Sequence, residues 1–128
     1  MIVKRYSLLD FPKEQVQKLL STLYPIPQFR PKVECESYHE VFFKTWICVF
    51  DGDHCIGKVA LFQNPEIEAL DSKTLIAGYF DSINSIEVMI LLTLEIAKYC
   101  TENGFSKIIG PLNCTTWDSY RLLKHAQA

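Results

Sequence analysis

The chain has 128 residues, of which 48% are hydrophobic and 22% charged, and this composition is typical of one globular domain with a sizeable core. A net charge of −2 leaves no basic excess for a general nucleic-acid surface. The sequence has neither about 18 consecutive apolar residues, as a membrane helix needs, nor a signal-peptide core, so we expect a soluble, cytoplasmic protein without a membrane partner.

The cysteines and histidines give no metal or disulfide signal. Five cysteines are widely spaced, odd in number and without a C-x-x-C pair, which argues against a disulfide framework and a zinc site. The three histidines share no metal-ligand spacing. Cys114 lies where a helix N-terminus would lower its pKa, but no suitable histidine partner is evident in the sequence. We therefore interpret the cysteines as reduced thiols and predict no metal.

The N-terminal third predicts a strand and a helix, followed by a segment rich in proline. Residues 2–7 are rich in strand-forming residues. Asp10 then offers an acidic helix cap, Pro12 fits the first turn, and apolar residues at helical spacing continue until Pro25. Residues 25–39 contain three prolines, which predicts an irregular connection or a broken short helix. This segment is either a surface loop or part of a binding wall.

Two strongly strand-like runs predict a β-hairpin. Residues 41–50 and 54–63 flank an Asp-Gly pair, which is among the clearest hairpin signals. Gly57, inside the second run, indicates a bulge or a close approach of the backbone. A further strand is expected at residues 74–80, after a polar loop.

The longest helix is expected at residues 85–103. Ser85 is a suitable N-cap, and Asn103-Gly104 gives a left-handed C-terminal cap. An apolar stripe indicates that the helix packs on a sheet, and we expect the following residues to widen this stripe: Met89, Ile90 and Leu94. Residues 105–112 then form a strand parallel to 74–80, reached by a right-handed crossover. A second helical pattern follows the polar hinge at residues 113–116.

This order of elements resembles the GNAT (GCN5-related N-acetyltransferase) superfamily over nearly the whole chain. The segments DGDHCIGKVALF and GFSKIIGPLN resemble family segments, and Asn113 and Tyr120 stand seven residues apart, as in the family. The resemblance implies one α+β domain over residues 1–128, with a mixed, mainly antiparallel sheet of about five strands flanked by helices. The two strands that end the family's sheet have no counterpart in residues 1–128, which would leave the strand at residues 105–112 as an exposed sheet edge. We therefore expect either a homodimer that covers this edge or a longer protein.

The resemblance also implies a site for acetyl-CoA or another acyl-CoA. Pantetheine would pair with the backbone of the fourth strand, helix N–H groups would hold the pyrophosphate, and an asparagine would steady the cofactor. The corresponding cofactor-binding residues of this chain are Ile76, Ala77, Gly78, Tyr79, Phe80, Ser85, Ile86 and Asn113. Tyr120 would be the catalytic acid that protonates the departing thiolate.

The implied function is transfer of an acetyl or acyl group to an unknown amine. Direct attack of the amine is expected because the sequence offers no convincing covalent nucleophile. The chain departs from the family at residues 81–88, DSINSIEV, where the glycine-rich pyrophosphate loop is absent and Asp81 and Glu87 add negative charge. This departure keeps open a non-catalytic relative that acts as a binding or assembly module. An unrelated α+β domain is the third alternative.

Overall fold

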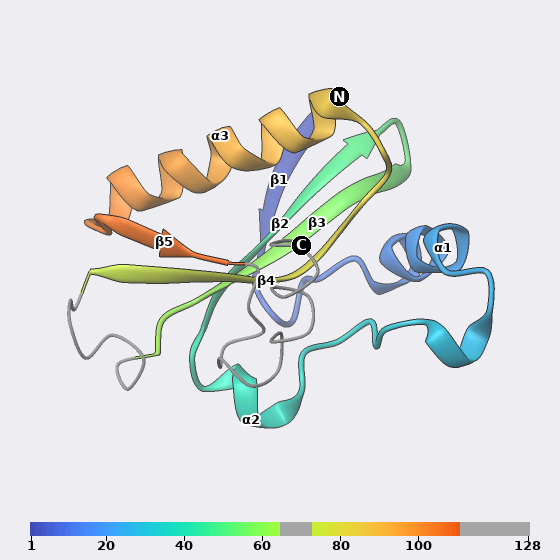
Figure 1. The fold of residues 1–128 in the computed structure, drawn as a ribbon, viewed down its shortest axis with the longest axis horizontal. Helices are drawn as coiled ribbons and strands as arrows, with labels where there is room; N and C mark the ends of the chain where they lie inside the picture. Colours follow the sequence, from blue (N-terminus) through green and yellow to red (C-terminus); the bar gives the residue numbers. More distant parts are fainter. Residues whose placement is uncertain (65–72, 111–128) are drawn as a thin grey trace, which may run out of the picture.

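The computed structural model describes residues 1–64 and 73–110, and its ribbon shows a twisted sheet between helices (Figure 1). Its elements are β1 (Ile2–Tyr6), α1 (Lys13–Leu23), a short 3-10 turn (Pro27–Phe29), α2 (Ser37–Glu40), β2 (Phe43–Asp51), β3 (His54–Phe62), β4 (Thr74–Ser82), α3 (Ile86–Asn103) and β5 (Lys107–Ile109). The strands lie in the order β1-β2-β3-β4-β5, with β5 parallel to β4 and the other pairs antiparallel. This arrangement confirms the predicted fold class.

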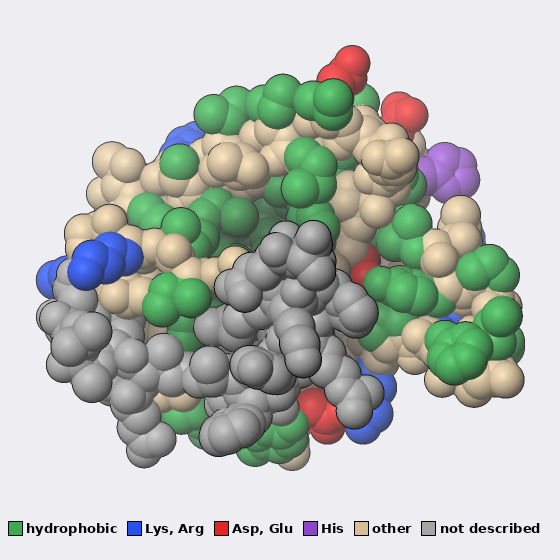
Figure 2. Space-filling model, viewed as in Figure 1, with side chains coloured by type: hydrophobic (Ala, Val, Ile, Leu, Met, Phe, Trp, Pro, Cys, Tyr) green, Lys and Arg blue, Asp and Glu red, His purple; other side chains and the backbone are tan. Residues whose placement is uncertain are grey.

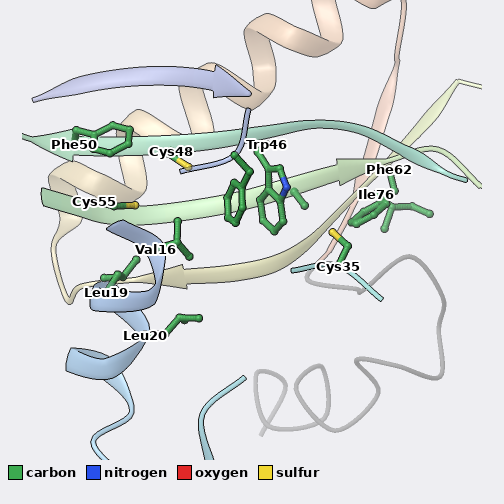
Figure 3. Close-up of a cluster of buried hydrophobic side chains, with 12 residues drawn as sticks. Val16, Leu19, Leu20, Cys35, Trp46, Cys48, Phe50, Cys55, Phe62 and Ile76 are labelled. Carbon is green, nitrogen blue, oxygen red and sulfur yellow. The ribbon is translucent and has the colours of Figure 1, made fainter. Parts of the chain in front are cut away.

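One apolar core lies between the sheet and α1. The buried face of α1 carries Val16, Leu19 and Leu20, which are at most 4% exposed. They pack in one cluster with β2 and β3 side chains, and Figure 3 shows them directed toward the strands. Trp46 stacks on Phe11 with ring centroids 4.1 Å apart, and both rings belong to this cluster.

The second core lies on the opposite face, beneath α3. Val88 and Leu92 of α3 pack on inward-facing residues of β2, β3 and β4. The helix ends as predicted: the Ser85 hydroxyl accepts the Val88 N–H at 3.4 Å, and Gly104 adopts the left-handed conformation at φ 75°. The chain thus crosses from β4 over α3 to the parallel strand β5, where Thr74–Ile76 pair with Lys107–Ile109.

The predicted hairpin and the role of Gly57 are both confirmed. Asp51 pairs with His54, so a two-residue turn joins β2 to β3. A register shift lies beside Gly57, and a Cβ added there would lie 2.6 Å from Cγ1 of Val88. The missing side chain therefore lets α3 approach the sheet closely.

Two expectations about the first third of the chain are refined by the structure. Helix α1 begins at Lys13 with Pro12 in the capping position, so the prediction that Asp10 caps it is wrong. The Ser7 hydroxyl instead donates to the Asp10 carboxylate at 3.1 Å. The segment at residues 25–39 is a broken helix, since it contains the 3-10 turn and the start of α2.

The prediction that Met89, Ile90 and Leu94 widen the buried stripe of α3 is wrong. These side chains are 43%, 51% and 62% exposed. Only one side of α3 packs on the sheet, so Ile90 and Leu94 are exposed to solvent, whereas Met89 borders a groove between α3 and the sheet. Figure 2 shows green side chains along the helix. Within the described ranges, no helix is long and apolar enough to cross a membrane.

Candidate functional site

The two parallel strands β4 and β5 pair over only part of their length. Strand β5 pairs with Thr74–Ile76, whereas β4 continues to Ser82. Gly110 follows β5 and lies against β4, since a Cβ added to it would lie 2.8 Å from the carbonyl oxygen of Ala77. In the part of the chain that the structure describes, residues 78–82 of β4 therefore have a strand partner on the β3 side alone.

An apolar groove of about 470 Å³ lies between α3 and this part of the sheet. Figure 2 shows it as a hollow beneath α3 lined by hydrophobic side chains. Its floor comes from β3, β4 and the β5 end, and its wall comes from α3; the lining residues are Val59, Ala77, Phe80, Met89, Thr93, Ile96, Ala97, Cys100, Ile108 and Gly110. The groove can hold an elongated, mainly apolar group alongside β4.

The N-terminus of α3 follows β4 closely in the chain, because only residues 83–85 separate them. Ile86 and Glu87 occupy the first turn, where backbone N–H groups have no intrahelical acceptor. The aligned peptide dipoles make this end partly positive, and an anion is favoured there. The Ser85 hydroxyl caps the Val88 N–H, and the N–H groups of Ile83 and Ser85 in the preceding turn donate to the carbonyl oxygens of Ile56 and Ile83.

A bulge in β4 divides its residues between the two faces of the sheet. Lys58 pairs with Asp81 and Ala60 with Gly78, so two residues of β4 stand opposite one residue of β3. Tyr79, one of the two, has a φ of 52°, which is strained for a tyrosine. Phe80 faces the groove, whereas the Tyr79 ring packs on the other face against Trp46, with centroids 6.0 Å apart.

A buried ion pair holds this bulge from the α1 side. The Lys58 ammonium donates to the Tyr79 carbonyl oxygen at 2.5 Å and lies 2.9 Å from the Asp81 carboxylate. Lys58 and Asp81 are 1% and 6% exposed. The Tyr24 hydroxyl donates to the same carboxylate at 2.7 Å, and burial together with this bond raises the pKa of Tyr24 to about 12.

The Lys58 contact corrects one expectation from the sequence. Asp81 was expected to add negative charge where an anionic ligand would bind. The structure instead places its carboxylate on the α1 face, where the Lys58 ammonium neutralises it. Glu87 remains in the first turn of α3, where a carboxylate stabilises the helix.

The Tyr79 hydroxyl forms a second polar cluster, with residues of the α2 segment. It accepts the Glu36 N–H at 3.1 Å and lies 2.5 Å from Nδ1 of His39. His39 is 1% exposed and its ring lies edge-on to Phe62 and Tyr79. Burial raises the pKa of Tyr79 above its ordinary value, so the hydroxyl stays protonated at neutral pH.

The structure places most of the predicted cofactor residues along β4 and at the start of α3. Ala77 and Phe80 line the groove, and Gly78 and Tyr79 lie in β4 between them. Ile76 pairs with both β3 and β5, and its side chain is buried on the α1 face. Ser85 and Ile86 begin α3 as expected. Asn113 and Tyr120 lie outside the described residues.

Two features of the site were missed at the level of sequence. The first is the Lys58–Asp81 ion pair. The sequence signal for it is the lysine in the mainly apolar run of β3, HCIGKVALF, because a charge inside a buried strand needs a partner. The second is the His39–Tyr79 contact, which joins residues 40 positions apart and has no local signal. Within residues 1–64 and 73–110, no three metal-ligating side chains are placed to hold a metal ion.

No protein-family model and no curated protein matches the chain. Solved structures do match. An aminoglycoside acetyltransferase from an uncultured soil metagenomic sample, in complex with sisomicin, superposes with a TM-score of 0.62, 14% identity and coverage of 98% of this chain and 85% of its own. The ribosomal-protein-alanine N-acetyltransferase of Brucella melitensis biovar Abortus 2308 superposes with a TM-score of 0.55 and 14% identity. This match covers 84% of this chain and 77% of its own.

The chain shares the fold of these two acetyltransferases. A Vibrio cholerae integron cassette protein also shares it, with a TM-score of 0.59, 12% identity and coverage of 99% of this chain and 84% of its own. At these identities the likeness is one of fold, and the activities named belong to those proteins. Within this fold, the residues predicted to bind a cofactor fall on β4 and the start of α3, beside the apolar groove.

Proposed function

We propose that the chain is an acyltransferase that moves an acetyl or other acyl group from acyl-CoA to an amine. One observation carries the proposal. The apolar groove beneath α3 runs along β4 at the point where β5 pairing stops, and the start of α3 follows directly. An elongated donor with an apolar arm and an anionic diphosphate fits this combination of surfaces.

The residues that bind the donor have separate tasks. Backbone groups of Gly78 and Phe80 pair with the amide groups of pantetheine, because β5 pairs with β4 only at Thr74–Ile76 among the described residues. The Tyr79 carbonyl oxygen between them already accepts from Lys58. The turn at Ser85 and Ile86 receives the diphosphate at the positive end of α3. Asn113 steadies the donor, as the family resemblance implies.

The reaction is direct transfer. The neutral amine attacks the thioester carbonyl, a carbon–nitrogen bond forms and the carbon–sulfur bond breaks. The thiolate takes a proton from Tyr120, and the proton that the attacking nitrogen loses replaces it on Tyr120, so the step balances. The spacing of Tyr120 from Asn113 supports this assignment. The acceptor is a small-molecule or peptide amine, and it approaches from the face of the sheet that carries α1 and α2.

The second candidate is a non-catalytic GNAT-fold module for binding or assembly. The turn between β4 and α3, residues 83–85, has no glycine, and the Ile86 side chain is 79% exposed at the place where a phosphate would bind. Side chains there restrict how closely a ligand approaches the backbone. Binding of acyl-CoA without transfer, or no binding, would favour this candidate.

A groove-filling variant with a matched control tests the proposed site. Thr93 and Thr101 both lie on α3, and each hydroxyl donates to the carbonyl four residues earlier, but only Thr93 lines the groove. We expect Thr93→Trp to weaken acetyl-CoA binding at least tenfold and Thr101→Trp to leave it unchanged, as read by thermal-shift titration. Equal binding by wild type and Thr93→Trp would place the donor elsewhere and contradict the proposal.

A further inference from the structure

A second pocket lies on the face of the sheet opposite the groove, between α1 and the start of β3. Its volume is about 210 Å³, and its lining includes Gln15 and Thr22 of α1 and Cys55 of β3. Cys55 shares a buried cluster with Leu19 of α1, and Figure 3 shows both side chains between the strand and the helix. The Cys55 residue is only 5% exposed, so this pocket is the route by which a small molecule reaches its thiol.

A second buried thiol contacts Cys55 from the neighbouring strand. Cys48 of β2 is fully buried in the same cluster, and the two thiols form a hydrogen bond. Each thiol has one proton to donate, and the Cys55 S–H donates to the Gly57 carbonyl oxygen at 3.5 Å. The proton between the two sulfur atoms therefore belongs to Cys48, and Cys55 Sγ is the acceptor.

This direction of the hydrogen bond favours a thiolate on Cys55. Ionisation gives up the weak bond to Gly57, whereas the bond from Cys48 remains and becomes stronger on a charged acceptor. The Cys48 hydrogen bond lowers the pKa of Cys55 although burial acts in the opposite direction, and the Lys58 ammonium adds to the lowering. The same hydrogen bond raises the pKa of Cys48. Cys55 is therefore the nucleophile of the pair.

We propose that Cys55 is a site of oxidative modification, which a small peroxide reaches through this pocket, and that Cys48 is its positioning residue. The Cys55 thiolate attacks one oxygen of hydrogen peroxide, a sulfur–oxygen bond forms and the oxygen–oxygen bond breaks. The departing hydroxide takes up the proton that Cys55 released and becomes water. The sulfur is oxidised to a sulfenic acid and the peroxide is reduced. This site is separate from the groove and does not depend on acyl transfer.

The rates at which individual thiols disappear in hydrogen peroxide test the proposal. After oxidation at neutral pH, the unfolded protein is alkylated and cleaved before Asp51 and Asp53, which places Cys48 and Cys55 in separate peptides for mass spectrometry. Cys100 is the internal control, because it is more exposed than Cys55 and burial raises its pKa. We expect Cys55 to lose its free thiol at least ten times faster than Cys100. A Cys100 that reacts as fast as Cys55 would overturn the proposal.

Substitutions of Cys48 test its role as hydrogen-bond donor. We expect Cys48→Ala to slow the oxidation of Cys55 about tenfold, because the thiolate loses its donor. Cys48→Ser retains a donor, so its rate should stay within about threefold of the wild type. A purely structural role of Cys48 would not separate the two variants in this way. Equal rates of Cys55 oxidation in Cys48→Ala and the wild type would overturn the assignment.

A pair of substitutions on α1 tests the route. Gln15 and Gln17 are both exposed on this helix, and of these two only Gln15 lines the pocket. We expect Gln15→Trp to fill the pocket and slow the peroxide oxidation of Cys55 about tenfold, and Gln17→Trp to leave the rate unchanged. Wild-type rates in both variants would show that peroxide does not use this pocket and would contradict the proposed route.

Discussion

Lys58 is the residue on which the shape of the candidate site depends. Its ammonium is buried, and it contacts both the Asp81 carboxylate and the carbonyl oxygen of the strained Tyr79. A charge removed from water is costly unless hydrogen bonds and an opposite charge compensate it. These contacts provide that compensation, and they hold the bulge that separates the groove face of β4 from the α2 face.

Loss of one charge of this pair should destabilise the protein strongly. We expect Lys58→Met to lower the free energy of unfolding by about 3 kcal/mol, because Asp81 would remain buried without a cation. In Lys58→Met/Asp81→Asn both sites are uncharged and the introduced amide oxygen still accepts the Tyr24 hydroxyl, so much of the loss should be recovered. Urea denaturation measures both values. A double variant that is less stable than Lys58→Met alone would contradict this account.

Tyr24 should make stability depend on pH in the alkaline range. Its pKa is raised to about 12 in the folded protein from the ordinary value of 10.0, so the folded state holds the phenol proton more tightly than the unfolded chain does. This contribution to stability is fully present below pH 10 and is lost as pH rises toward 12. Tyr24→Phe should therefore flatten the fall in melting temperature above pH 10. An equally steep fall in the variant would contradict the assignment.

Helix α3 is the element that forms both the second core and the wall of the groove. Its buried side reaches the sheet closely because Gly57 of β3 has no side chain. We expect Gly57→Ala to lower the free energy of unfolding by about 1–3 kcal/mol, since the added Cβ would lie 2.6 Å from Val88 Cγ1. Gly57→Ala/Val88→Ala should cost less than the sum of the two single changes in urea denaturation. Simple additivity would show that the contact is not the cause.

Elements with local signals could be predicted from the sequence, whereas contacts between distant strands could not. The hairpin turn after Asp51, the Ser85 cap and the Gly104 cap depend on neighbouring residues, and the structure confirms all three. The outward direction of Leu94 was missed because helical spacing does not state how wide a buried stripe is. The bulge at Tyr79 depends on the register between β3 and β4, which no local pattern specifies.

Strand β5 forms one edge of the described sheet, and this bears on the assembly of the whole molecule. Ile108 and Ile109 are 46% and 38% exposed, and β5 pairs with β4 alone among the described elements. An apolar edge of this kind favours association. We propose that two copies associate and expect the mass of a dimer by light scattering at high protein concentration. Ile109→Lys should shift the mass toward the monomer, and a wild type that stays monomeric would contradict the proposal.

The central claim for the whole molecule is that the groove and the start of α3 together bind acyl-CoA. Titration calorimetry with acetyl-CoA tests it most directly. We predict saturable binding of one acetyl-CoA per chain, and at 100 times the dissociation constant the ligand should stabilise the folded protein by about 2.7 kcal/mol. The absence of both binding heat and stabilisation at millimolar acetyl-CoA would contradict the claim.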